Sequence, residues 1–450
     1  MAADQTRLDA DELREAWSLL PHDDRAEGFR LLASGDAEEF FLDLTATDQY
    51  DLITALSPSE RRLWLRLLPP DDAADLIQQS EDDDRRLLLD LLDDATRREV
   101  TALLAYAEDE AGGLMSSRFA RVRPDMSVDE AISYLRRQAL ADKNVETLYY
   151  VYVLDAAQHL RGVLSFREIF SSRPERRISE VMNTDFVVVP EEMDQEEVAR
   201  MFADYDVVAL PVVEEGGRMV GIVTVDDIVD VVEEETTEDV QKYGGMEALD
   251  EPYMRTSFRD LMKKRLGWLA VLFIGEMFTA TALGVFQNEM EKAVVLALFI
   301  PLIISSGGNS GSQASTLVIR AMTVGEVRIR DWWRVARREV MAGLVLGTVL
   351  GALGFVRITL WSALATTQWG QHVHMTQYPH HWLVAATVWT SLIGVVLFGT
   401  MAGSMLPFIL RALKFDPASA SAPLVATLVD VTGLVIYFLV ASMILRGVLL

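Results

Sequence analysis

Asp430 is the residue whose position in the sequence points most directly to chemistry. It lies in the middle of an apolar run, residues 421–446, that is long enough to cross a membrane. A carboxylate inside such a segment is costly and usually serves a function. Helical spacing brings Ala426, Thr427, Gly433 and Tyr437 to the same side of the helix. These neighbours suit a narrow, hydrated cation passage; the alternative is an aspartate that packs through hydrogen bonds or pairs with an arginine.

Two further polar features interrupt apolar runs. Residues 305–315 read Ser-Ser-Gly-Gly-Asn-Ser-Gly-Ser-Gln-Ala-Ser, in which Asn309 and Gln313 are four positions apart on one helix face. These amides are placed to hold water around a passing ion, whereas the glycines also allow two helices to pack closely. Glu276 is a third candidate, either for an ion path or as the partner of a polar residue on another helix.

The elements that must position these residues are apolar helices. Five runs reach roughly 20 residues, the length that spans a bilayer: 267–287, 293–319, 340–361, 382–410 and 421–446. Basic residues gather before the first run, between the second and third, and between the fourth and fifth. Since Lys and Arg favour the cytoplasmic side, we expect a multi-pass protein of the inner membrane, with its N-terminal domains cytoplasmic and its C-terminus outside.

Charge divides the chain into two dissimilar parts. Residues 1–265 hold 60 acidic and 30 basic residues, whereas the remainder holds 8 and 11. So acidic a region argues against a nucleic-acid partner, which requires clustered basic residues. The chain has no cysteine, which excludes disulfides, thiolate catalysis and Cys-ligated metals.

The sequence shows no sign of an enzyme. No phosphate-binding Gly-x-x-x-x-Gly-Lys-[Ser/Thr] motif occurs, and no Ser/His/Asp constellation suggests itself. Four of the six histidines fall between the third and fourth apolar runs: His372, His374, His380 and His381. These four side chains could bind a transition metal, or they could simply occupy a solvated loop.

The acidic region contains a repeat. Segments of about 115–178 and 182–240 share the order strand, helix, buried strand, turn, strand and helix start. This order resembles a tandem pair of CBS (cystathionine-β-synthase) domains, modules that often bind adenine nucleotides. The resemblance implies ATP as a regulator, held near Tyr150, Arg167, Glu168 and Val207 at the edges of the repeats.

We therefore expect a multidomain fold. Its parts are an all-α helical-repeat N domain at 1–112, α/β tandem CBS domains at 113–240, a linker or plug helix at 241–265, and a five-helix transmembrane domain at 266–450. The N domain shows helical periodicity alone, with an acidic exterior.

Nearly the whole chain resembles the MgtE family of bacterial magnesium channels. The resemblance rests on the domain order and on three motifs: Asp-Glu-Ala-Gly-Gly-Leu-Met at 109–115, Gly-Gly-Asn-Ser-Gly-Ser-Gln at 307–313, and Pro-Leu-Val-Ala-Thr-Leu-Val-Asp-Val-Thr-Gly at 423–433. It implies a homodimer within membrane lipid, with Asp430 as the pore carboxylate. It also implies cytosolic Mg²⁺ sensor residues: Asp71, Asp75, Asp194, Glu196, Asp206, Asp227, Asp230, Glu235, Glu238, Asp239 and Asp416. One departure is Ala422, where the family usually has asparagine before the matching proline.

The expected function is therefore a Mg²⁺-selective channel that cytoplasmic Mg²⁺ closes. Mg²⁺ takes oxygen ligands and keeps several waters, so one carboxylate per chain is a fitting site. The alternatives are a carrier of Mn²⁺ or Co²⁺, and a membrane-anchored nucleotide sensor that conducts nothing. An anchor has no need of Asp430 or of the polar second run, so these features favour transport.

Overall fold

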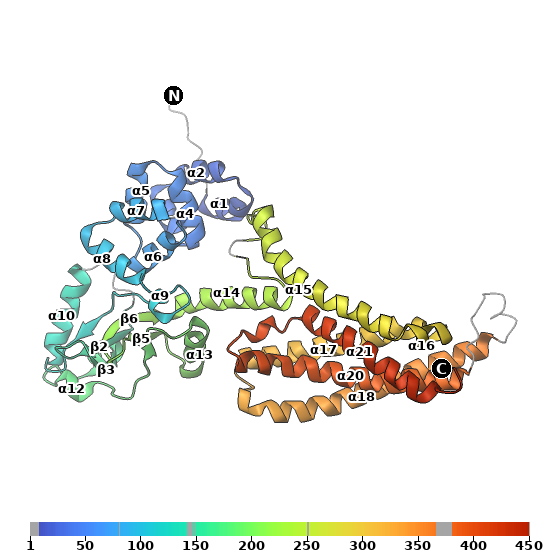
Figure 1. The fold of residues 1–450 in the computed structure, drawn as a ribbon. Coiled ribbons are helices and arrows are strands. Elements are labelled where there is room, and N and C mark those ends of the chain that lie inside the picture. Colours follow the sequence, from blue (N-terminus) through green and yellow to red (C-terminus); the bar gives the residue numbers. More distant parts are fainter. Residues whose placement is uncertain are drawn as a thin grey trace. The chain divides into compact units, whose positions relative to one another are not determined.

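The computed structural model describes residues 9–80, 82–141, 147, 149–249, 252–365 and 380–449. The chain forms two compact units, Met1–Glu233 and Glu234–Leu450 (Figure 1). His372 and His374, two of the four loop histidines, lie outside the described residues.

The first unit begins with short stacked helices: α1 (Ala10–Ala16), α2 (His22–Arg30), α3 (Ser34–Leu42), α4 (Ala46–Ala55), α5 (Pro58–Leu65), α6 (Pro70–Gln78), α7 (Asp82–Leu91) and α8 (Asp94–Leu103), with a 3-10 turn at Trp17–Leu19. Local sequence sets their starts. Asp93 caps α8 by accepting the backbone N–H groups of Ala95 and Thr96, and prolines occupy the first position of α5 and α6. Aromatic rings fill the core; those of Phe29 and Trp64 lie 4.9 Å apart, edge to face.

Two small three-stranded sheets follow, as the repeat predicts. The first repeat contains α9 (Ala111–Leu114), β1 (Arg121–Val122), α10 (Val128–Ala141), β2 (Tyr150–Leu154), β3 (Leu160–Ser165) and α11 (Phe166–Ser171). The second contains α12 (Ile178–Val181), β4 (Val189–Pro190), α13 (Gln195–Tyr205), β5 (Ala209–Val213), β6 (Met219–Thr224) and α14 (Val225–Tyr243). In each sheet a parallel pair joins an antiparallel pair, in the order β1-β2-β3 and β4-β5-β6.

Each repeat lends its first residues to the sheet of the other. Ser116 exchanges backbone hydrogen bonds with Ile222 of β6, at 2.8 and 2.9 Å. Asn183 does the same with Val163 of β3, both at 2.9 Å. The two glycines of the repeat make this approach feasible, because a Cβ on Gly221 would lie 2.7 Å from the sulfur of Met115. The repeats are therefore one interlocked pair.

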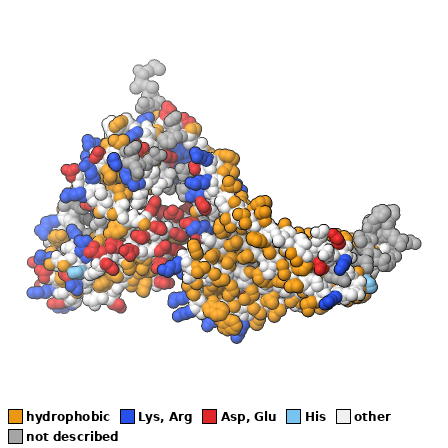
Figure 2. Space-filling model, viewed as in Figure 1, with side chains coloured by type: hydrophobic (Ala, Val, Ile, Leu, Met, Phe, Trp, Pro, Cys, Tyr) orange, Lys and Arg blue, Asp and Glu red, His pale blue; other side chains and the backbone are white. Residues whose placement is uncertain are grey.

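The second unit contains the membrane-spanning helices. Among the described residues, five helical segments are long and apolar enough to cross a bilayer: Phe258–Val285, Val294–Thr323, Ile329–Ala365, His381–Ala412 and Ala422–Leu445. Their main helices are α15 (Phe258–Val285), α17 (Ile300–Thr323), α18 (Trp332–Ala365), α20 (His381–Ala412) and α21 (Ala422–Leu445). Short pieces join them: α16 (Gln287–Lys292) and 3-10 turns at Val294–Phe299, Ile329–Asp331 and Pro417–Ser419. Exposed apolar side chains cover these helices in Figure 2.

Glycines let these helices pack at very short distances. A Cβ on Gly399 would lie 2.3 Å from the carbonyl oxygen of Gly307, and one on Gly403 would lie 2.0 Å from that of Gly311. Helices α17 and α20 thus meet backbone to backbone along part of the Gly/Ser-rich stretch. Close packing through small residues is the usual way for helices to associate inside lipid.

The linker differs from the helix expected at 241–265. Helix α14 continues from the second repeat as far as Tyr243, and α15 begins at Phe258. Gly244 and Gly245 separate the two, and Gly245 has a positive φ of 77°. That conformation ends helices and favours glycine, so the Gly-Gly pair explains the early stop.

Candidate functional site

Asp430 lies on α21 where α15 and α17 pack against that helix. A Cβ on Gly275 of α15 would lie 2.6 Å from Cγ2 of Thr427, one turn before Asp430. A Cβ on Gly307 of α17 would lie 2.8 Å from Cγ1 of Val429. The Asp430 side chain is half-buried, and the carboxyl of Glu276 lies within hydrogen-bonding reach of it. The structure thus brings together two of the sequence's three intramembrane candidates.

Helix α17, which packs against α21, carries a polar stripe. Ser305, Asn309 and Gln313 are exposed at intervals of four residues, whereas Gly307 and Gly311 on the other side of the helix are buried. Exposed amides on a membrane helix need water or a polar partner, since lipid offers neither. The stripe has the character of a wet surface.

Two residues expected beside Asp430 use their hydroxyls elsewhere. Tyr437 is buried, and its hydroxyl donates to the Leu296 carbonyl at 2.9 Å. Thr427 donates to the carbonyl of Pro423, four residues earlier in its own helix, at 3.0 Å. Tyr437 thus joins α21 to the 3-10 turn at Val294–Phe299, and Thr427 bonds within α21 itself.

A second candidate site lies in the first unit, where α6 meets the start of α14. The pKa of Asp72 is raised to about 7. Burial is the main cause, followed by the nearby carboxylates of Asp71, Asp227, Asp226 and Asp230. The pKa of Asp227 is also raised to about 7, mainly by burial. Hydrogen bonds from Thr224 lower this pKa, whereas the nearby charges of Asp71 and Asp226 raise it further. Burial and the neighbouring Asp72 and Asp71 also raise the pKa of Asp75 well above its usual value. We call Asp71, Asp72, Asp75, Asp226, Asp227 and Asp230 the α6–α14 acidic cluster.

Not every carboxylate oxygen of the α6–α14 acidic cluster has a hydrogen-bond partner. Oδ1 of the buried Asp71 has no hydrogen-bond partner, and burial raises the pKa of this carboxyl. In the part of the chain that the structure describes, no three His, Asp or Glu side chains converge closely enough to enclose a metal ion. The chemistry of the donor set fits a hard cation, because every member offers carboxylate oxygens.

Asp227 has a structural role as well. Its Oδ2 accepts the Thr224 N–H at 3.0 Å and the Thr224 hydroxyl at 2.6 Å, a capping interaction at the start of α14. Sequence reasoning missed Asp72. A run of carboxylates at 71, 72 and 75, all on one short helix, is the signal that would have included it.

The remaining sensor candidates fall into two groups. In the first unit, Asp194 is the N-cap of α13 and accepts the Glu196 N–H at 2.9 Å. Glu196 forms an ion pair with Arg200 at 2.5 Å. Asp206 lies at the C-terminal end of the same helix, where its φ is 51°. In the second unit, Lys242 pairs with both Glu238 and Asp416, and its Nζ lies 2.7 Å from Asp416 Oδ2. Thr323 donates to Asp239 at 3.4 Å, and Glu235 is half-buried.

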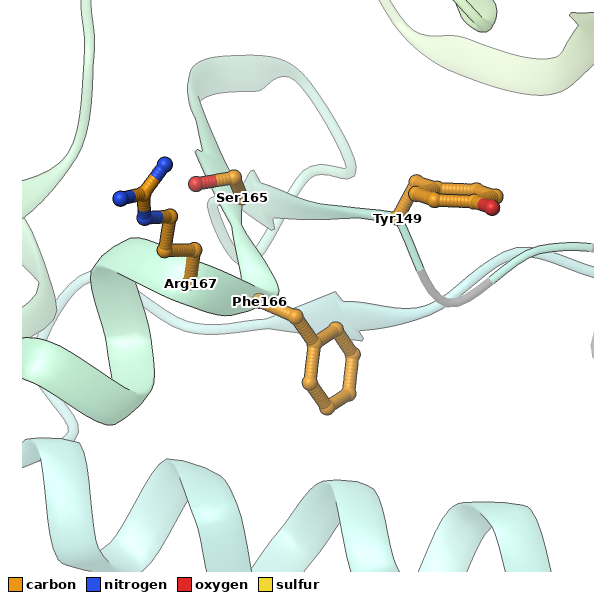
Figure 3. Close-up of a pocket in the computed structure, with 4 residues that line it drawn as sticks. All are labelled: Tyr149, Ser165, Phe166 and Arg167. Atoms are coloured by element: carbon orange, nitrogen blue, oxygen red, sulfur yellow. The ribbon is translucent and has the colours of Figure 1, made fainter.

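The nucleotide-site candidates are only partly brought together. A hollow of about 420 Å³ is lined by Tyr149, Ser165, Phe166 and Arg167 (Figure 3). Tyr150 is the next residue along the chain, but Glu168 is engaged in a capping box with Ser165, whose N–H donates to it at 2.7 Å. Val207 packs at the edge of the core shared by the N-terminal helices and the second repeat. Tyr149 and Phe166 were missed from sequence, although both flank predicted residues.

Comparisons with known proteins agree across the chain. The family model described as "Divalent cation transporter" matches residues 300–440, "MgtE intracellular N domain" matches 8–109, and "CBS domain" matches 111–175 and 178–234.

Individual relatives extend the match. "Magnesium transporter MgtE" of Thermus thermophilus is 44% identical over 359 residues, which cover 80% of this chain and 75% of that protein. The protein of the same name in Bacillus subtilis is 32% identical over 426 residues, covering 94% of this chain and 89% of the relative. A solved structure, described as the cytosolic domain of the Mg²⁺ channel MgtE in complex with ATP, is 43% identical with a TM-score of 0.46, covering 50% of this chain and 92% of that one.

The family models thus match the region of the intramembrane carboxylate and polar stripe as well as the acidic first unit. Both of these relatives are named as magnesium transporters. The chain belongs to the MgtE family of magnesium transporters.

Proposed function

We propose that the protein is a Mg²⁺-selective channel of the inner membrane, with Asp430 as the carboxylate that meets the ion. The observation that carries the proposal is a half-exposed carboxylate in the middle of an apolar helix, together with exposed amides on the adjacent helix α17. Asn309 and Gln313 provide oxygen atoms that can bond to the waters around the ion. Mg²⁺ gives up its waters reluctantly, so a carboxylate with amide neighbours suits a hydrated ion. Binding of this kind is also weak enough to let the ion leave.

The path is proposed to form between two copies of the chain. Only 6% of the most apolar part of α15 is buried within one protomer, and the polar stripe of α17 is exposed. In a symmetric homodimer the same surface occurs twice, so two Asp430 carboxylates would balance the two charges of Mg²⁺. Membrane lipid would cover the remaining apolar surface.

Cytoplasmic Mg²⁺ is proposed to close the channel. Raised pKa values in the α6–α14 acidic cluster show that its carboxylates are costly to ionise together. A bound dication would remove that cost in the compact arrangement, which gives Mg²⁺ a preference for one state. The proposed ligands are Asp71, Asp75, Asp194, Glu196, Asp206, Asp227, Asp230, Glu235, Glu238, Asp239 and Asp416, to which we add Asp72.

The topology and domain limits follow the same proposal. We propose domain limits of 1–112, 113–240, 241–265 and 266–450, although α14 extends into the third of these domains. Basic side chains that flank the spans, such as Lys263 and Arg337, favour a cytoplasmic location for the loops that hold them. Five spans then leave the C-terminus outside.

ATP is a proposed regulator rather than a substrate. The hollow beside Arg167 has an exposed aromatic side chain in Tyr149 and a cation for phosphate, the two groups that a nucleotide needs. Calorimetry of the full-length protein with ATP tests this proposal. Heat that disappears in an Arg167→Ala variant would support it, and no heat at millimolar ATP would contradict it.

Ion flux into liposomes that contain the purified protein is the test of the main proposal. A panel of Mg²⁺, Mn²⁺ and Co²⁺ separates a magnesium channel from a carrier of transition metals. Asp430→Asn keeps the side-chain shape but removes its charge, so Mg²⁺ flux should collapse while the dimer still assembles. Wild-type flux in a well-folded Asn variant would contradict the pore role. No flux of any divalent ion through the wild-type protein would favour the nucleotide-sensor alternative.

A further inference from the structure

We propose that Glu276 is a second acidic determinant of cation selectivity, held beside Asp430 by the packing of α15 on α21. This inference rests on the proposed role of Asp430 in the ion path. It assigns a task to a residue that matches none of the three sequence motifs.

Contacts at two levels fix α15 alongside α21. In the middle, Gly275 of α15 meets Thr427 of α21, where a Cβ would approach to 2.6 Å. Further along, the rings of Phe286 and Phe438 stack at 4.9 Å. Residue numbers rise together on both helices, so the helices run parallel. Glu276 follows Gly275 directly, Asp430 lies one turn beyond Thr427, and the two carboxyl groups lie within hydrogen-bonding reach of each other.

The surroundings of Glu276 do not suit a carboxyl group that faces lipid. Its neighbours on α15 are apolar and exposed on a single protomer: Phe273 (68%), Ile274 (58%), Met277 (58%) and Phe278 (61%). Glu276 itself is exposed. Within the described ranges, neither Glu276 nor Asp430 forms an ion pair. A carboxyl group at this depth is costly unless water or a cation reaches it.

Placement beside Asp430 gives Glu276 access to the same ion. Two carboxyl groups on adjacent helices create a stronger local field than one, and a stronger field favours a dication over a monovalent cation. A role in packing alone would require only a hydrogen-bonding side chain of similar size. Glutamine provides that, so the two roles can be separated.

The experiment measures Mg²⁺ flux against Mg²⁺ concentration, together with Na⁺ leak, in liposomes that contain full-length protein. Glu276→Gln should raise the half-saturating Mg²⁺ concentration by about tenfold, equal to about 1.4 kcal/mol of lost attraction, and should increase Na⁺ leak. Glu276→Asp should restore much of the selectivity, because it restores the charge. Glu291→Gln is the matched control, since this acid lies on α16, where it accepts a hydrogen bond from Gln287 at 2.9 Å.

The outcomes separate this inference from the pore proposal. If Asp430→Asn abolishes flux while Glu276→Gln leaves both half-saturation and Na⁺ leak at wild-type values, the role of Glu276 is refuted and Asp430 remains. If Glu276→Gln lowers only the maximal flux, its role is structural and the inference also fails. Wild-type flux in Asp430→Asn would remove the basis of both.

Discussion

At the residue scale, the aspartates of α6 are unusual because they lie close together beside buried apolar side chains. Asp71 is 8% exposed, and its neighbours on α6 include the fully buried Leu76 and Ile77. Burial of a carboxylate is unfavourable unless a cation, a proton or hydrogen bonds compensate its charge. Six carboxylates on α6 and the start of α14 compete for this compensation, so we expect the α6–α14 acidic cluster to respond to both pH and divalent cations.

The first prediction concerns pH. The native pKa values of Asp72 and Asp227, about 7, exceed the ordinary value of 3.8, so the native state binds more protons across that window. The free energy of unfolding contributed by these groups is therefore greatest below about pH 4 and falls as pH rises to about 7. Without divalent cations, α6 amides should exchange hydrogen faster at pH 8 than at pH 5, after correction for intrinsic rates. Millimolar Mg²⁺ should restore protection at pH 8.

A charge-neutral variant checks the cause of this pH dependence. Asp75→Asn removes one buried carboxylate, so it should reduce both the loss of protection at high pH and the response to Mg²⁺. Asp36→Asn on the exposed start of α3 is the matched control and should change neither. Equal protection at both pH values in the wild-type protein would contradict the electrostatic origin.

At the scale of elements, helix packing in the second unit depends on glycines that face a backbone. Gly403→Ala would place a methyl group 2.0 Å from the Gly311 carbonyl oxygen, which rigid backbone cannot accommodate. We expect a loss of about 1–3 kcal/mol of stability, seen as a lower melting temperature in detergent. Gly284→Ala on α15 is the control, because no atom lies within 4 Å of the added methyl group. Equal melting of both variants would show that α17 and α20 do not need this close approach.

The C-terminal end of helix α14 contacts α17 through Tyr243. The hydroxyl of Tyr243 donates to the Ser312 carbonyl at 2.9 Å, and the side chain packs against Ile319 and Ala418. Tyr243→Phe keeps the ring but loses a hydrogen bond worth about 1 kcal/mol. The amides of residues 234–245 should then exchange hydrogen faster. Val240→Ala, at an exposed position on the same helix, should leave exchange nearly unchanged. Unaltered exchange in Tyr243→Phe would show that the bond does not hold the end of α14.

Sequence patterns predicted the elements better than the contacts between them. The spans, the repeat and the capping of α11 by Ser165 and Glu168 all follow from local periodicity and residue type. The expected linker at 241–265 is not a single helix, because α14 ends at Tyr243, just before Gly244 and Gly245, and α15 begins at Phe258. Contacts such as Glu276 with Asp430, or Lys242 with Asp416, join residues more than 150 positions apart, and local patterns carry no information on such distances.

At the scale of the whole molecule, the proposed ion path lies in one unit, whereas the proposed sensor carboxylates extend over both units. The ion path belongs to the second unit, and the α6–α14 acidic cluster belongs to the first. Helix α14 contains the boundary between Glu233 and Glu234, so one helix includes residues of both units. We propose that Mg²⁺ bound at the carboxylates of the first unit and of α14 shifts the population of open channels through this helix.

The most direct measurement of that coupling is a current recording from single channels in a bilayer, with Mg²⁺ varied on the cytoplasmic side. The wild-type channel should close as cytoplasmic Mg²⁺ rises into the millimolar range. A variant in which Asp227, Asp230, Glu235, Glu238 and Asp239 are all replaced by Asn or Gln should conduct similarly at low Mg²⁺ and stay open at high Mg²⁺. A variant that lacks all five acids yet closes with the wild-type Mg²⁺ dependence would show that these carboxylates do not sense the ion.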